Sequence, residues 1–179
     1  MEKKNPIYQM VLAALFLSLA YVLPFLTGQI QEIGAMLCPM HLPVLLCGFF
    51  VGPVWGALIG AFAPILRSLM LGMPFLFPNA VCMAAELLTY GFVAGAMHRI
   101  LPRKKPLVYL SLLLAMIAGR IVWGGAMLIC VGAQGNTFTL SAFLAGALTG
   151  AIPGIVVQIV LVPLLVILLD FRKAKKKDK

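Results

Sequence analysis

Long apolar stretches, each close to the length needed to cross a lipid bilayer, constrain this chain more than any other feature. A membrane-spanning helix needs about 20 predominantly apolar residues. The chain has 179 residues, of which 63% are hydrophobic and 11% are charged, whereas a soluble domain carries about 25% charged residues. The sequence therefore predicts an all-α integral membrane protein.

Glycine and proline residues divide the apolar sequence into six expected helices. Gly52 and Pro53 separate a short second helix from the third, and Gly72 and Pro74 lie in the turn that follows the third helix. The expected helices cover residues 7–26, 40–50, 54–71, 79–98, 107–131 and 139–169, with Pro153 and Pro163 as candidate positions for a kink in the last helix. Six spans with short loops leave no room for a separate soluble domain, so we expect residues 1–179 to form one compact bundle.

Three clusters of basic residues test this number of spans. They precede the first helix (Lys3 and Lys4), separate the fourth helix from the fifth (residues 99–105) and close the chain (residues 172–179). Cytoplasmic loops of membrane proteins carry an excess of lysine and arginine. Six spans place all three clusters on one side, whereas five spans, with the second and third helices merged, would place the N-terminus opposite the other two clusters. We therefore expect six helices with both the N- and the C-terminus in the cytoplasm. The basic residues behind the net charge of +9 are then explained by the orientation of the helices in the membrane. The charge therefore does not predict nucleic-acid binding.

Three charged residues lie inside the apolar stretches: Arg67, Glu86 and Arg120. A charge near the centre of a bilayer costs roughly 2.5–3.5 kcal/mol, so such residues usually mark a transport path or a binding pocket. At a rise of about 1.5 Å per residue, Arg67, Glu86 and Arg120 lie about 6, 10 and 16 Å below the expected outer surface. We therefore expect all three to line one cavity that opens to the outside.

Helical spacing adds further candidates to this cavity. Asn79, Met83 and Tyr90 share the helix face of Glu86, and Trp123 shares the face of Arg120. A small-molecule pocket between these faces would combine apolar walls with a few polar groups. The full set of candidate substrate-binding residues is Arg67, Asn79, Met83, Glu86, Tyr90, Arg120 and Trp123, with His41 beside the first outer loop and Gln158 in the last helix.

A structural role for Glu86 and Arg120 is the alternative. Charged residues within membranes also pair with one another to hold helices together. The two roles are compatible, because an ion pair can support a site and open when a ligand binds.

Glycine residues recur every four positions in two parts of the chain. One series runs from Gly48 to Gly60 across the second and third helices, and another runs from Gly146 to Gly154 in the last helix. Small residues at this spacing let helix backbones approach closely in lipid. The two series predict tight packing of these helices, and Arg67, seven residues after Gly60, is expected to point into the bundle.

The sequence contains no motif of a catalytic or ATP-hydrolysing site. It lacks a G-x-x-x-x-G-K-[ST] phosphate-binding loop and an H-E-x-x-H metalloprotease motif. The four cysteines follow no paired spacing and mostly lie in apolar stretches. Cys38 and His41, with two neighbouring methionines, offer soft metal ligands, but no other residue completes a metal site. We expect no enzymatic activity, no metal and no cofactor.

Several segments along the chain together form a pattern known from one family of transport proteins. They are the small residues Ala13, Ala14 and Ser18 of the first helix, His41-Leu42-Pro43, Gly52-Pro53, Pro64-Ile65-Leu66-Arg67, Gly72-Met73-Pro74 and Glu86-Leu87-Leu88-Thr89-Tyr90-Gly91. With these segments the whole chain resembles the substrate-binding S components of energy-coupling factor (ECF) vitamin transporters.

This resemblance implies partners and a location. S components use an Ala-x-x-x-Ala motif in the first helix to contact the membrane-embedded T component, and the matching positions here are Ala14 and Ser18. Serine is small enough to preserve close helix contact. The resemblance also implies two ATP-binding-cassette ATPases that use ATP on behalf of the complex, a pocket built from the first outer loop and helices four to six, and residence in a bacterial cytoplasmic membrane as a multi-pass protein.

The expected function is therefore the capture of a water-soluble vitamin or related small molecule from outside the cell. Two arginines within the membrane favour a ligand with a carboxylate, such as pantothenate, because a guanidinium binds that group with two parallel hydrogen bonds. The alternative is a stand-alone proton-coupled transporter or channel that uses Glu86. The length of 179 residues disfavours it, because such carriers are commonly built from large paired repeats.

Overall fold

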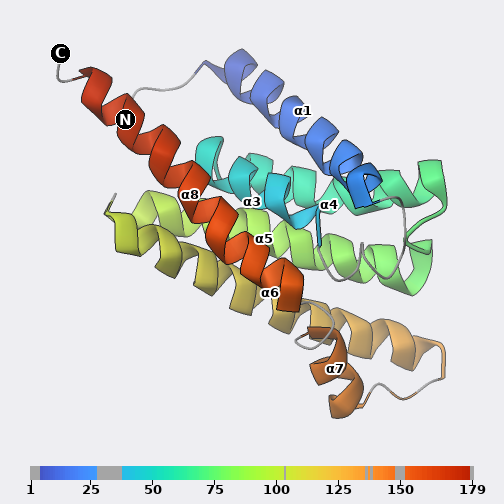
Figure 1. The fold of residues 1–179 in the computed structure, drawn as a ribbon. Helices are drawn as coiled ribbons and strands as arrows, with labels where there is room; N and C mark the ends of the chain where they lie inside the picture. The colour runs from blue at the N-terminus through green and yellow to red at the C-terminus, as the bar shows by residue number, and fades with distance from the viewer. Residues whose placement is uncertain are drawn as a thin grey trace.

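The computed structural model describes residues 5–27, 38–102, 104–135, 137, 139–147 and 152–177. All regular elements in these ranges are helical (Figure 1). In chain order they are α1 (Pro6–Val22), the 3-10 turn η1 (Leu23–Thr27), α3 (His41–Phe50), α4 (Pro53–Leu71), the π-helical turn η2 (Leu76–Ala80), α5 (Val81–Ile100), α6 (Lys105–Ala133), α7 (Leu140–Ala147) and α8 (Ile152–Lys177). The first outer loop lies mostly outside the described residues.

The helices begin and end at residues whose chemistry favours a boundary. The side chain of Asn5 accepts a hydrogen bond from the N–H of Ile7 (3.4 Å) at the start of α1, as amide side chains commonly do at helix N-termini. Between α3 and α4, Gly52 adopts φ +131°, and Pro53 opens α4. Gly72 ends α4 in the left-handed conformation that glycine adopts at little cost. Helix α4 thus covers Pro53–Leu71, where a helix over residues 54–71 was expected from glycine and proline.

Five helical segments in the described residues are long and apolar enough to cross a membrane: Pro6–Phe25, Pro53–Leu71, Leu76–Ile100, Lys105–Ala133 and Ile152–Leu169. Helix α3 has only 10 residues and is about 15 Å long at 1.5 Å per residue. This is about half the thickness of a bilayer core of roughly 30 Å. The second expected span is therefore a half-length helix held within the bundle.

Glycines form the closest helix contacts of the bundle. The backbone of α5 at Gly91 lies directly against Gly48 of α3 and Gly56 of α4, and a Cβ atom at any of these three positions would collide with backbone atoms of a neighbouring helix. Gly60 of α4 meets the backbone of α5 in the same way at Leu87. The tight packing predicted from the first glycine series is confirmed, and its physical basis is direct backbone approach.

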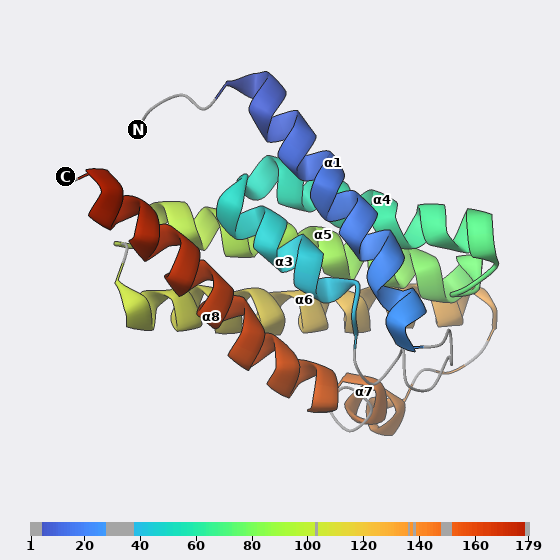
Figure 2. The ribbon, with the colours of Figure 1, turned by 45° about the horizontal axis from the view of Figure 1, so that its top comes forward.

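Helix α5 lies at the centre of this arrangement and packs against α3, α4 and α6. Helix α1 crosses α3 and α4, while α8 crosses α3 and α6, as both views show (Figures 1 and 2). The first turn of α1 and the last turn of α8 lie at the same end of the bundle. A bundle with both termini on one side of a membrane needs this arrangement.

The segment expected as one helix over residues 139–169 instead contains two helices, α7 and α8. They point in different directions (Figure 2), and residues 148–151 between them lie outside the described residues. Pro153 is the second residue of α8, a position where proline is tolerated because its missing N–H would be unpaired in any case.

Candidate functional site

The carboxylate of Glu86 is the centre of a buried polar cluster formed by three helices. Its Oε1 atom lies 3.0 Å from Nη1 of Arg120 on α6 and 3.5 Å from Nε2 of His41, the first residue of α3. Glu86 and His41 are each 2% exposed, and Arg120 is 16% exposed. The half-length α3 makes this meeting possible, because its first residue reaches the depth of Glu86 inside the bundle.

Tyr90 packs beside this cluster, one helical turn after Glu86. Its ring meets the ring of His41 edge to face, with a centroid distance of 5.3 Å, and it is fully buried. The ring rests on Gly119 of α6, where any side chain would collide with it. Gly119 was not a candidate from the sequence, although its position next to Arg120 offered a signal. It leaves room for Tyr90 to lie against the helix that carries Arg120.

Cys38 also belongs to the cluster, although it was not among the substrate-binding residues expected from the sequence. Its side chain is 7% exposed and lies within interaction distance of Arg120 and Glu86. Burial raises the pKa of the thiol to about 11, an effect that the positive charge of Arg120 opposes and the negative charge of Glu86 reinforces. Cys38 is therefore a neutral thiol near neutral pH. The Cys38 side chain therefore lies near the Arg120 guanidinium without adding a charge to the cluster.

Several polar atoms of the cluster lack hydrogen-bond partners among the described residues. They are Nε and Nη2 of Arg120, both ring nitrogens of His41 and the hydroxyl of Tyr90. Most buried polar groups in proteins are hydrogen-bonded. Nε and Nη2 form one edge of the guanidinium, and this edge is suited to two parallel hydrogen bonds to a carboxylate. The cluster thus has N–H donors on Arg120 without hydrogen-bond partners, next to the ion pair of Glu86 and Arg120.

Arg67 and Gln158 are buried elsewhere in the bundle. Arg67 is 8% exposed, and its guanidinium carbon lies 5.8 Å from the ring centroid of Phe25 in η1. Gln158 of α8 is fully buried, and neither of its amide atoms has a hydrogen-bond partner among the described residues. No ion pair or hydrogen bond described here joins either residue to Glu86. The structure does not bring Arg67 into contact with the two other membrane charges.

Three other candidate residues have different surroundings. Asn79 lies in η2 and is exposed. Met83 is partly buried against the hydrophobic core. Trp123 stacks on Phe143 of α7 with a centroid distance of 6.1 Å, and its ring covers Gly146. Trp123 therefore contributes to the contact between α6 and α7.

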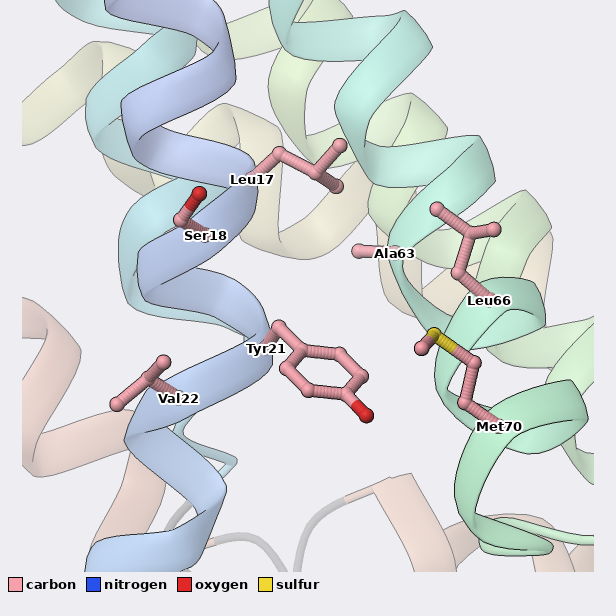
Figure 3. Close-up of a pocket in the computed structure, with 7 residues that line it drawn as sticks. All are labelled: Leu17, Ser18, Tyr21, Val22, Ala63, Leu66 and Met70. Atoms are coloured by element: carbon pink, nitrogen blue, oxygen red, sulfur yellow. The ribbon is translucent and has the colours of Figure 1, made fainter.

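An open cleft of about 380 Å³ lies between α1 and α4 (Figure 3). Its lining residues are Leu17, Ser18, Tyr21, Val22, Ala63, Leu66 and Met70. Glu86 and Arg120 are not among them, so this hollow is distinct from the pocket expected between the faces of α5 and α6. The two helix-one positions Ala14 and Ser18 are exposed, and the Ser18 hydroxyl donates a hydrogen bond to the carbonyl of Ala14 (3.0 Å).

Comparison with protein families decides the class of the protein. The family model described as "ECF transporter, substrate-specific component" matches residues 8–166. The chain belongs to this family. No curated protein and no solved structure matches the chain. The protein is therefore an integral membrane, substrate-binding subunit of a transporter and not an enzyme, and the resemblance inferred from the sequence is confirmed.

Within the described residues, no three histidine, cysteine or acidic side chains gather as a metal site would require.

Proposed function

We propose that this ECF substrate-specific component captures a small water-soluble acid, of the size of a vitamin or vitamin precursor, from outside a bacterial cell. The single observation that carries the general function is the family match over residues 8–166. The buried cluster of Glu86, Arg120 and His41 supports the acidic character of the ligand. Pantothenate is an example of this ligand class.

The free edge of Arg120 is the main support for an acidic ligand. Its Nη1 atom is held by Glu86 at 3.0 Å, while Nε and Nη2 have no hydrogen-bond partner among the residues described. A ligand carboxylate at this edge would accept two parallel hydrogen bonds without displacing Glu86. The Glu86–Arg120 pair then supports the site by orienting the guanidinium, so a structural and a binding role coexist.

The start of α3 adds a second favourable feature for an anion. His41 begins this helix and lies beside Glu86. The N-terminus of a helix carries a partial positive charge of about half a unit, and interrupted helices in membrane transporters often direct such ends at anionic substrate groups. Tyr90, whose ring lies against His41, contributes a buried hydroxyl without a described hydrogen-bond partner, which suits a ligand that also carries hydroxyl or amide groups.

Energy for transport is proposed to come from other subunits. The chain carries no phosphate-binding loop, and its family is defined as the substrate-specific part of an ECF transporter. We propose that it works in the bacterial cytoplasmic membrane with a T component, docked at Ala14 and Ser18, and with two ATPases. ATP is then used by these partners, and the subunit itself needs no cofactor.

Native mass spectrometry of the purified protein tests the proposed ligand class. We expect one small molecule to be retained per chain, and its mass to correspond to a compound with a carboxylate or a comparable acid. Titration with a panel of vitamins would then identify the ligand by its affinity. A ligand without any acidic group would contradict the role proposed for Arg120 while leaving the transport function in place.

A further inference from the structure

The cleft between α1 and α4 has the character of a site for an apolar chain. Its walls are formed by apolar side chains, apart from Ser18 and Tyr21 (Figure 3). The hydroxyl of Ser18 already donates to the carbonyl of Ala14. A water-soluble molecule would therefore find almost no hydrogen-bond partners in this cleft. A hydrocarbon chain has no polar groups, so it would leave no hydrogen bond unmade there.

The surroundings of the cleft face the hydrocarbon of the membrane. Both α1 and α4 lie within segments that are long and apolar enough to span a bilayer. Val22, Leu66 and Met70, which line the cleft, are 53%, 38% and 69% exposed. Because apolar side chains on a spanning helix are exposed to lipid tails, the cleft opens toward the lipid phase.

A buried positive charge lies on the same helix face as the cleft wall. Arg67 follows Ala63 by four residues and precedes Met70 by three, so all three share one face of α4. Tyr21, which lines the cleft, is close enough to interact electrostatically with the guanidinium. Within the described residues Arg67 forms no ion pair, and its Nη1 atom has no hydrogen-bond partner. An unpaired charge within a membrane is costly, and pairing relieves that cost.

We propose that the cleft between α1 and α4 binds one acyl chain of an anionic membrane phospholipid, and that Arg67 holds the phosphate of the same lipid. Arginine binds phosphate through two parallel hydrogen bonds. Arg67 lies four residues from the end of α4, about 6 Å along the helix axis, which is within reach of the headgroup level for a long side chain.

Native mass spectrometry of protein released from nanodiscs tests this lipid site. The nanodiscs contain equal amounts of phosphatidylglycerol and phosphatidylcholine, and the measured quantity is the fraction of protein that retains phosphatidylglycerol. Arg67→Gln removes the charge, and Leu66→Trp fills the cleft from its wall. Leu69→Trp is the matched control, because Leu69 lies on the same helix, is 68% exposed and does not line the cleft.

We expect the retained fraction to fall about tenfold in Arg67→Gln, as loss of one charge-assisted contact implies. We expect it to fall more than twofold in Leu66→Trp, because the indole occupies the space of the acyl chain, and to be unchanged in Leu69→Trp. Retention within twofold of the wild type in either of the first two variants would overturn the proposal. A second readout, affinity for the co-purified water-soluble ligand, separates the lipid site from the transport site. If Arg67→Gln loses that ligand and keeps the lipid, Arg67 belongs to the transport site and the proposal is wrong.

Discussion

Replacement of Arg120 by lysine tests whether the free edge of the guanidinium holds a ligand. Lysine keeps the positive charge and can still approach Glu86, which now lies 3.0 Å from Nη1. It cannot supply the two parallel N–H donors of Nε and Nη2. Loss of a charge-assisted hydrogen bond costs about 1.5–3 kcal/mol. We therefore expect the dissociation constant of the ligand to rise roughly ten- to a hundredfold.

Neutral substitutions separate this binding role from a purely structural one. Glu86 is 2% exposed and Arg120 is 16% exposed, so removal of one partner leaves a buried unpaired charge. Such a loss costs about 3–5 kcal/mol, and we expect Glu86→Gln and Arg120→Gln each to lower the yield of folded protein and its unfolding temperature. The double variant is expected to recover much of this stability, because no unpaired charge remains.

Calorimetric titration of the three neutral variants and Arg120→Lys, together with thermal unfolding, decides between the roles. If the pair serves binding, the well-folded double variant binds the ligand more weakly than the wild type. If the double variant is well folded and binds with unchanged affinity, Glu86 and Arg120 only hold α5 and α6 together. That result would remove both residues from the proposed site.

Three further predictions concern other parts of the chain. Ala14→Trp or Ser18→Trp is expected to abolish co-purification with the T component while ligand affinity stays nearly unchanged, because both positions are exposed on α1; normal co-purification of both variants would refute the docking role. Gly91→Ala is expected to destabilise the protein by about 1–3 kcal/mol, because its methyl group would collide with the backbone of α4. Gly125→Ala, where a methyl group meets no atom within 4 Å, is the matched control, and equal unfolding temperatures of the two variants would contradict the packing analysis. Burial raises the pKa of the Cys38 thiol from 9.0 to about 11. Near neutral pH its thiolate fraction is therefore about a hundredfold lower than that of a thiol with the ordinary pKa. In a variant with Cys38 as its single cysteine, alkylation is therefore expected to accelerate as the pH rises toward 11, and a rate that levels off near pH 9 would show that burial does not raise this pKa.

The helix boundaries and the closest helix contacts were predictable from the sequence because glycine and proline act locally. Gly52 adopts φ +131° and Pro53 opens α4, so this pair ends one helix and begins the next through its own backbone geometry. The glycine series from Gly48 to Gly60 predicted close packing, which the contact with Gly91 confirms. The sequence predicted one helix over residues 139–169, whereas α7 and α8 are separate helices that point in different directions (Figure 2); apolar composition alone did not distinguish them.

The grouping of the candidate site was predictable only in part. Helical spacing correctly placed Tyr90 close to Glu86, and the contact between Glu86 and Arg120 followed from their polar faces on neighbouring helices. Periodicity does not tell which neighbour a face meets, and the stacking of Trp123 on Phe143 of α7 could not be predicted from it. Arg67 was grouped with Arg120 on depth alone. The depth of a residue gives its position along the membrane normal, but it does not tell which helices its side chain faces.

Uptake by reconstituted liposomes is the most direct test of the proposed transport function. The purified chain is reconstituted alone, or with a T component and two ATPases, and accumulation of its co-purified ligand is measured with and without a proton gradient. We predict binding but no accumulation by the chain alone, and ATP-dependent accumulation by the complete complex. Concentrative uptake by the chain alone, driven by a proton gradient, would contradict its proposed role as a binding subunit that depends on partner ATPases.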